Sequence, residues 1–213
     1  MEMDNEVKMN DYTKEWKNYI NEQQEKYQIF CDLDGVLVDL ITGVNTAIYA
    51  EAPENASERY KKAQEKAREA LGGKTLEEED ANKNSDKFKK PVREFMFRVM
   101  DDDRHFWMNL PWMPGGKELW DYIKKYDPII LSRPTDLQSL IGKKAWVKRN
   151  VGLTGDRVQI RYDKSPYANY QGKTGILIDD FLKNTTKFEA AGGRTILYTS
   201  APQAIKELET LGF

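Results

Sequence analysis

The chain has 213 residues, of which 39% are hydrophobic and 32% are charged. This length and composition suit one globular domain, or a core domain that carries a modest insertion. No run approaches the roughly 18 apolar residues that a membrane-spanning helix needs, and the first ten residues, MEMDNEVKMN, are too polar for a secretory signal. The net charge of −2 argues against a dedicated nucleic-acid-binding protein, which would carry a basic stripe.

The chain holds one cysteine, Cys31, and one histidine, His105. A single cysteine cannot form an internal disulfide, so we expect a cytoplasmic protein in a reducing compartment. The same two counts exclude a zinc site built from histidine and cysteine ligands alone.

The first predicted elements are a helix and a strand. Residues 11–26 predict a helix because their aromatic and aliphatic side chains recur at helical spacing. The apolar segment 27–31 predicts a strand, and Asp32, Asp34 and Gly35 follow it directly. A buried strand that ends in acids and a glycine indicates a functional loop.

Residues 40–112 differ in character, because they are rich in charge and contain no strand-like run. Asn55 and Glu58 resemble a capping box, and Gly72 with Gly73 predicts a helix end. A second helix is indicated by apolar residues at helical spacing: Phe88, Val92, Phe95, Met96, Val99 and Met100. We interpret this block as a helical insertion after the first strand, and its charge as the surface of solvated helices.

From residue 114 onward the predicted helices and strands alternate. Helices are expected at 117–126, at 136–149, before Gly192 and at the C-terminus, and strands at 128–132, 157–160, 175–179 and 195–198. This alternation predicts an α/β fold with a five-stranded parallel sheet. The core is then 1–39 with 113–213.

Polar side chains follow the predicted strands at one edge of this sheet. Asp32 and Asp34 follow the first strand, Ser132 ends the second, Lys164 follows the third, and Asp179 with Asp180 follows the fourth. Ligands of such sheets bind beyond the carboxyl ends of the strands. Two carboxylates about 4 Å apart repel by roughly 4 kcal/mol at an effective dielectric of 20, so a cation must offset them. Mg²⁺, which prefers oxygen ligands, is the simplest candidate.

Each of these features alone has a plainer interpretation. An Asp-x-Asp after a strand can be a turn, Asp179 and Asp180 can begin a helix, and Lys164 can be a surface lysine. Phe106, Trp107 and Trp112 can line a substrate pocket or pack the insertion against the core. The combination at separate strand ends favours a catalytic site.

Four segments in this order resemble the four motifs of the haloacid dehalogenase (HAD) superfamily: FCDLDGVLVDL, IILSRP, YDK and GILIDD. Within this superfamily the chain resembles the 5′(3′)-deoxyribonucleotidase group. Three features carry this resemblance: HFW before LPWMPGG, Lys143 three residues before Trp146, and Asp163 before Lys164. The resemblance implies a Rossmann-like core with a helical cap at 40–112.

The resemblance also implies roles for the site residues. Asp32 would be the nucleophile that forms an aspartyl-phosphate, and Asp34 the general acid and base. Mg²⁺ would be held by the Asp32 carboxylate, the Asp34 carbonyl and the Asp179–Asp180 pair. Substrate phosphate would be bound by four residues: Ser132, Arg133, Lys143 and Lys164.

These roles predict a Mg²⁺-dependent phosphatase for small phosphomonoesters, with (deoxy)nucleoside monophosphates as the expected substrates. Two alternatives stay open. One is a 3′-phosphatase on nucleic-acid ends, which the low net charge disfavours. The other is a non-catalytic binding protein with the same fold, which the intact Asp32 and Asp34 disfavour.

Overall fold

The computed structural model describes residues 22, 25–79, 88–102 and 105–213. The helix predicted over 11–26 lies outside the described residues, except for 22, 25 and 26, which are helical. Among the described helices, none is long and apolar enough to cross a membrane.

The centre of the fold is a parallel sheet, as predicted. Its strands β1 (Tyr27–Cys31), β2 (Ile129–Ser132), β3 (Val158–Ile160), β5 (Lys173–Asp179) and β6 (Arg194–Leu197) run parallel in the spatial order β3-β2-β1-β5-β6. A short antiparallel strand, β4 (Asn169–Tyr170), pairs with the start of β5. β4 was not predicted, because two residues are too few for an alternating pattern.

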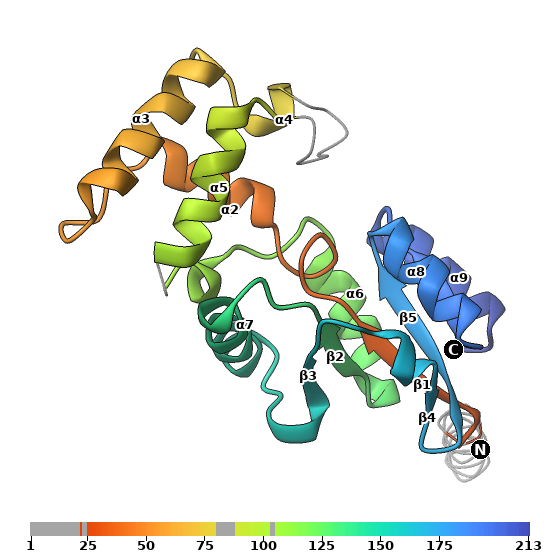
Figure 1. Cartoon of the computed structure of the whole chain (residues 1–213). Helices are drawn as coiled ribbons and strands as arrows, with labels where there is room; N and C mark the ends of the chain where they lie inside the picture. The colour runs from red at the N-terminus through yellow and green to blue at the C-terminus, as the bar shows by residue number, and fades with distance from the viewer. Residues whose placement is uncertain (1–21, 23–24, 80–87, 103–104) are drawn as a thin grey trace, which may run out of the picture.

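Both faces of the sheet are covered, which explains why its strands are nearly all apolar. Ile29 and Cys31 of β1 belong to the larger core, while Phe30 belongs to a smaller one on the opposite face. Helix α8 (Leu182–Ala190) closes the smaller core with Phe188. Helices α6 (Gly116–Ile123) and α9 (Ala201–Thr210) contact one another beside the larger core (Figure 1).

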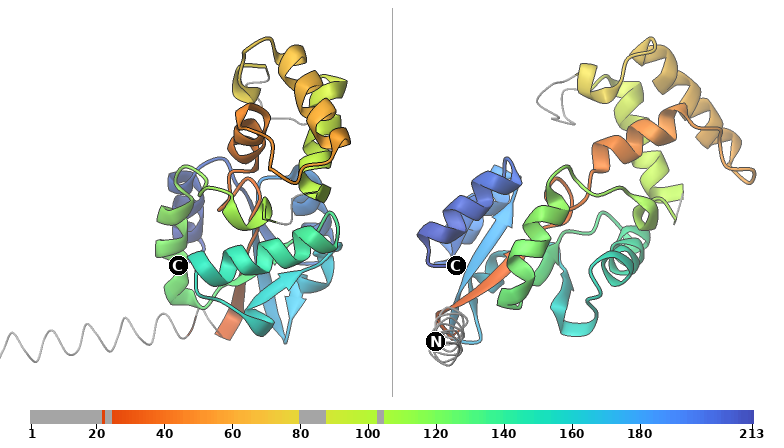
Figure 2. Two further views of the ribbon diagram at one scale, coloured as in Figure 1. Left: turned by 90° about the vertical axis from the view of Figure 1, so that its left-hand side faces the viewer. Right: turned by 180° about the vertical axis from the view of Figure 1, so that it is seen from behind.

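Part of the segment between β1 and β2 forms a group of helices away from the sheet. It contains α2 (Leu40–Tyr49), α3 (Glu58–Leu71), α4 (Leu76–Glu79) and α5 (Lys90–Asp102), which lie beyond the carboxyl end of the sheet in every view (Figures 1 and 2). Gly72 ends α3 in the left-handed conformation, as expected. The capping box predicted at Asn55 is wrong, because α3 begins at Glu58 and the Ser57 hydroxyl accepts the hydrogen bond from the Tyr60 amide.

The chain leaves and re-enters the core through two adjacent segments. The Asp39 amide donates to the Pro111 carbonyl at 3.0 Å, and the Met113 amide donates to the Leu37 carbonyl at 2.8 Å. Val38 and Trp112 form an isolated antiparallel bridge between them. The ends of the helical segment are therefore joined immediately beyond the loop that carries Asp32 and Asp34.

Candidate active site

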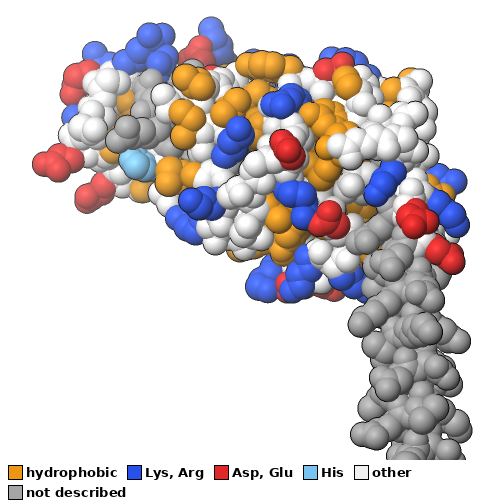
Figure 3. Space-filling model, turned by 90° about the horizontal axis from the view of Figure 1, so that it is seen from below, with side chains coloured by type: hydrophobic (Ala, Val, Ile, Leu, Met, Phe, Trp, Pro, Cys, Tyr) orange, Lys and Arg blue, Asp and Glu red, His pale blue; other side chains and the backbone are white. Residues whose placement is uncertain are grey.

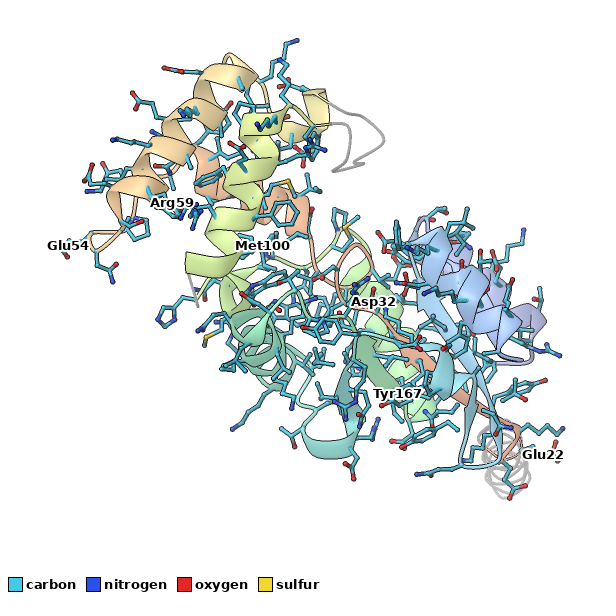
Figure 4. All side chains as sticks on the ribbon, viewed as in Figure 1. Glu22, Asp32, Glu54, Arg59, Met100 and Tyr167 are labelled. Atoms are coloured by element: carbon cyan, nitrogen blue, oxygen red, sulfur yellow. The ribbon has the colours of Figure 1, made fainter. Side chains whose placement is uncertain are left out.

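Asp32 lies at the carboxyl end of β1, in the centre of the molecule between the sheet and the inserted helices (Figure 4). Its amide donates to the Ile178 carbonyl of β5 at 2.9 Å, which fixes its backbone to the neighbouring strand. One carboxylate oxygen accepts from the Leu33 amide at 2.7 Å, and the other is 2.9 Å from Lys164 Nζ. The side chain is thus held in place and almost fully buried.

Lys164 joins Asp32 to the end of β5. Its ammonium group is 2.6 Å from Asp179 Oδ2, and the lysine is only 4% exposed. Asp179 also accepts hydrogen bonds from the Phe181 amide at 2.9 Å and from Asn184 Nδ2 at 3.0 and 3.2 Å. Burial alone would lower the pKa of Lys164, but the carboxylates of Asp32 and Asp179 raise it above its ordinary value. Lys164 therefore stays charged.

Asp34 is paired with the second buried lysine of the site. Lys143, from α7 (Leu137–Asn150), places Nζ 2.5 Å from Asp34 Oδ2, 2.5 Å from the Arg133 carbonyl and 3.3 Å from Ser132 Oγ. The other oxygen, Asp34 Oδ1, is buried and accepts no hydrogen bond from any described group. A buried, unpaired carboxylate oxygen is costly, so its presence indicates a group that meets a ligand.

Burial and neighbouring negative charges raise the pKa values of three carboxyl groups in the site. Desolvation, and then the charge of Asp32, raises the pKa of Asp34, although Lys143 opposes the shift. The same two causes raise the pKa of Asp179 to about 6. For Asp180, desolvation followed by the charges of Asp32 and Asp179 raises the pKa to about 7. The raised pKa values favour the protonated forms, because two lysines do not offset four ionised carboxylates.

Three of these carboxylates could hold a metal ion. Asp32, Asp179 and Asp180 each offer an oxygen, and the three oxygens lie within 4.8 Å of one another. The donor set is all oxygen, which suits Mg²⁺, and the four acids of the site outnumber its two lysines, so a divalent ion would favour their ionised forms. The carboxylate of Asp34 lies outside this group, because it is engaged by Lys143.

Gly35 allows the close approach of these acids. It has a φ of 77°, and a Cβ atom on it would lie 2.0 Å from Asp180 Oδ2. The glycine after Asp34 is therefore needed both for the turn and for the space that Asp180 fills.

The remaining predicted substrate-binding residues lie around this cluster. Ser132 is buried at the end of β2, and Arg133 is exposed, with its guanidinium 6.0 Å from the Tyr162 ring centre. Lys143 and Lys164, expected to bind phosphate, are each engaged by carboxylates as well. The structure thus brings all the predicted residues to one edge.

The aromatic residues expected near a pocket are mainly packed. Trp107 is 1% exposed, and its ring centre lies 4.8 Å from Lys143 Nζ. Phe106 is also buried, while Trp112 is half-buried and its ring centre lies 4.8 Å from that of Trp146. These contacts favour the packing interpretation for Phe106 and Trp107.

Two contributions were not predicted from the sequence. Asn184 donates to both oxygens of Asp179, and its only sequence signal is its position four residues after Asp180 on the helix that follows. The ring of Trp107 lies against the Lys143 ammonium group. This contact joins distant parts of the chain, so no local sequence pattern predicts it.

Among the comparisons with known proteins, only the one with solved structures found a similarity. No model of a protein family matches the chain, and no curated protein matches it. The chain is similar to a hydrolase from Streptococcus pneumoniae TIGR4, at 18% identity and a TM-score of 0.47, over 85% of this chain and 97% of that one.

Two further solved structures share the likeness. A HAD family enzyme from Bacteroides thetaiotaomicron, in complex with magnesium and inorganic phosphate, is 20% identical with a TM-score of 0.41, over 82% of this chain and 94% of that one. The L-2-haloacid dehalogenase from Xanthobacter autotrophicus is 16% identical with a TM-score of 0.43, over 87% of this chain and 82% of that one. These identities and TM-scores are low, so the chemistry of this chain rests on its own side chains.

Proposed function

We propose that this chain is a Mg²⁺-dependent phosphomonoester hydrolase of the HAD superfamily, acting on (deoxy)nucleoside monophosphates in the cytoplasm. The observation that carries the proposal is the pair of acids on the loop after β1. Asp32 is held by Lys164 and the Leu33 amide, and Asp34 by Lys143, with Asp34 Oδ1 unpaired. One fixed carboxylate and one carboxyl of raised pKa suit a nucleophile beside an acid.

In the first step, an oxygen of Asp32 forms a bond to phosphorus while the bond to the leaving oxygen breaks. Asp34 gives its proton to that oxygen, which departs as an alcohol. The raised pKa of Asp34 supports this role, because the group then holds a proton closer to neutral pH than an ordinary aspartate does.

In the second step, water attacks the phosphorus of the aspartyl-phosphate, and Asp34 accepts the proton that the water loses. Inorganic phosphate leaves, and Asp32 and Asp34 return to their starting states. Lys164, which contacts Asp32, and the Ser132 hydroxyl, which contacts Lys143, would donate to phosphoryl oxygens as charge builds up.

Asp32, Asp179 and Asp180 would hold Mg²⁺, with the Asp34 carbonyl as a further ligand. When bound, the ion offsets the repulsion between the carboxylates and an anionic substrate. Asp179 already accepts from Lys164, Asn184 and the Phe181 amide, whereas no hydrogen bond from a described donor reaches the Asp180 carboxylate. The Asp180 carboxylate is therefore more available to a metal ion than that of Asp179.

The helices of 40–112 would form a cap over the core of 1–39 and 113–213. The pairing of Val38 with Trp112 supports this division, because it joins both ends of the segment at the catalytic loop. A cap excludes water and contacts the leaving group. The preference for nucleotides rests on the motif resemblance.

The net charge of −2 favours a small substrate over a nucleic-acid end. On the lower face, which lies away from the candidate site, Lys and Arg side chains form several separate groups and not one stripe (Figure 3). A protein that tracks a phosphate backbone would gather such cations along its path.

The test is a panel of phosphomonoesters assayed with Mg²⁺ and with EDTA. It should include a nucleoside monophosphate, a sugar phosphate, a small aryl phosphate and a 3′-phosphorylated oligonucleotide. We expect phosphate release from the small substrates in Mg²⁺, none in EDTA, and the highest kcat/KM for the nucleotide. Release from no substrate would contradict the proposal and favour a binding protein, and a preference for the oligonucleotide would favour the 3′-phosphatase.

A further inference from the structure

A basic pocket of about 180 Å³ adjoins the catalytic carboxylates on the side of α8. Its outer wall contains Arg133 from the loop after β2, with Lys183 and Lys187 one turn apart on α8. Its inner wall is formed by Lys164 and Asn184, the two residues that contact Asp179. The pocket and the candidate active site therefore share a wall.

The cations of the outer wall are only partly offset by acids that line the pocket. Lys164 is engaged by Asp32 and Asp179, but within the described residues no ion pair involves Arg133, Lys183 or Lys187. The one acid of the pocket, Asp163, accepts hydrogen bonds from the hydroxyl and the amide of Ser165, at 2.8 and 3.1 Å.

The charge of Asp163 is thus the only negative one to set against three cations. Its hydrogen bonds from Ser165, and then the charge of Lys187, lower the pKa of Asp163, so it stays ionised. An excess of positive charge remains in the pocket, next to a catalytic edge with an excess of negative charge. Such a pocket attracts an anion.

The size of the pocket limits what that anion can be. Pockets for whole drug-sized ligands measure about 300–1,000 Å³, so this one has room for a phosphoryl group and not for a nucleoside. Lys164 lines the pocket and also contacts Asp32, so a single side chain lies between an anion bound in the pocket and the carboxylate of Asp32.

We infer that this pocket binds a second phosphoryl group of the substrate, so that the preferred substrates are small molecules with two phosphoryl groups, one of which is hydrolysed. The inference rests on the proposed function and deepens it. It assigns to Lys183 and Lys187 a role in substrate choice that the resemblance does not imply.

The test compares matched mono- and bisphosphorylated substrates. Suitable pairs are a nucleoside 5′-monophosphate with its 3′,5′-bisphosphate, and a hexose 6-phosphate with its 1,6-bisphosphate. The proteins are the parent, the double variant Lys183→Gln/Lys187→Gln, and the control Lys62→Gln/Lys66→Gln, which removes two exposed lysines at the same spacing from α3. The readout is the ratio of kcat/KM values within each pair, at low and high salt.

We expect the parent and the control to favour one bisphosphate by about tenfold at low salt, and less at high salt because exposed charges are screened. The α8 double variant should lose this preference while its kcat/KM for the monophosphate stays within about twofold. A preference that survives in the α8 variant, or is absent from an active parent, would overturn the inference. A parent that hydrolyses neither member would refute the proposed function itself.

Two further experiments distinguish a second phosphoryl group of the substrate from other anions that the pocket could bind. Inorganic phosphate is added to the monophosphate reaction, and a 3′-phosphorylated oligonucleotide replaces the bisphosphate. An effect of free phosphate that requires Lys183 and Lys187, without a preference for a bisphosphate, would contradict binding of a substrate group. A lysine-dependent preference for the oligonucleotide over every bisphosphate would contradict a small substrate.

Discussion

At the scale of single residues, the site is a balance between four carboxylates and two buried lysines. Lys164 offsets the charges of Asp32 and Asp179, and Lys143 offsets that of Asp34, while no cation among the described residues forms an ion pair with Asp180. Desolvation, followed by the charges of Asp32 and Asp179, raises the pKa of Asp180 to about 7. A divalent cation would offset the excess negative charge.

The first prediction concerns stability against pH in EDTA. The pKa of Asp180 rises from 3.8 in the unfolded chain to about 7 in the folded one, so the folded protein binds more protons between these values. Its contribution to the free energy of unfolding therefore falls as pH rises through that window. We expect Asp180→Asn to melt at a higher temperature than the parent at pH 8 and to differ less at pH 5.

Magnesium and a second variant control this experiment. Mg²⁺ should raise the melting temperature of the parent at pH 8 and leave that of Asp180→Asn nearly unchanged. Asp163→Asn should change stability in the opposite direction, because the pKa of Asp163 is lowered. A lower melting temperature for Asp180→Asn than for the parent in EDTA at pH 8 would contradict the account.

The second prediction concerns Asn184, which donates to both oxygens of Asp179. Residues that orient a metal ligand typically change metal affinity or activity by about 10–100-fold. We therefore expect Asn184→Ala to lower kcat/KM about tenfold and to raise the Mg²⁺ concentration needed for half-maximal rate. The exposed Asn169→Ala is the control, and an unchanged Mg²⁺ requirement in Asn184→Ala would refute the positioning role.

At the scale of elements, α7 links the active site to the inserted helices. Gly142 of α7 touches Trp107, since a Cβ atom added to this glycine would lie 2.3 Å from Trp107 Cβ. The next residue, Lys143, lies over the ring of the same tryptophan and binds Asp34. The distance between α7 and Trp107 therefore determines the position of the Lys143 ammonium group.

The third prediction uses this contact. Gly142→Ala should lower the free energy of unfolding by about 1–3 kcal/mol, the usual cost of overpacking, although alanine favours helices. It should also reduce kcat, because the displaced Trp107 no longer supports Lys143. Urea denaturation and steady-state rates measure both effects, with the exposed Lys144→Ala as control. Unchanged stability in Gly142→Ala would show that the contact is not tight.

Several elements were predictable because their patterns are local. The strand at 27–31 was found with its observed ends, and the later strands and the helix at 136–149 were found within two residues. The helix predicted over 117–126 ends three residues earlier, at Ile123, where a 3-10 turn follows. The capping box at Asn55 failed because a better-placed hydroxyl, that of Ser57, lies nearer the helix start. β4 has only two residues, which is too short for a pattern that would predict a strand.

At the scale of the whole molecule, parallel topology brings distant residues together. The acids and Lys164 could be predicted at one edge, because the carboxyl ends of parallel strands meet there. The pairing of Lys143 with Asp34, 109 positions apart, could not, because it depends on how α7 packs against Trp107. The basic pocket beside α8 likewise arises from three separate segments.

The central claim is that Asp32 is the nucleophile of a phosphatase. The most direct measurement is kcat for phosphate release from a small aryl phosphate in Mg²⁺, for the parent and for Asp32→Asn. The amide keeps the shape of the side chain but removes its nucleophilic oxygen anion. We predict a loss of about a thousandfold or more, with a melting temperature no lower than that of the parent. A kcat within about tenfold of the parent, on folded and pure Asp32→Asn protein, would contradict the account.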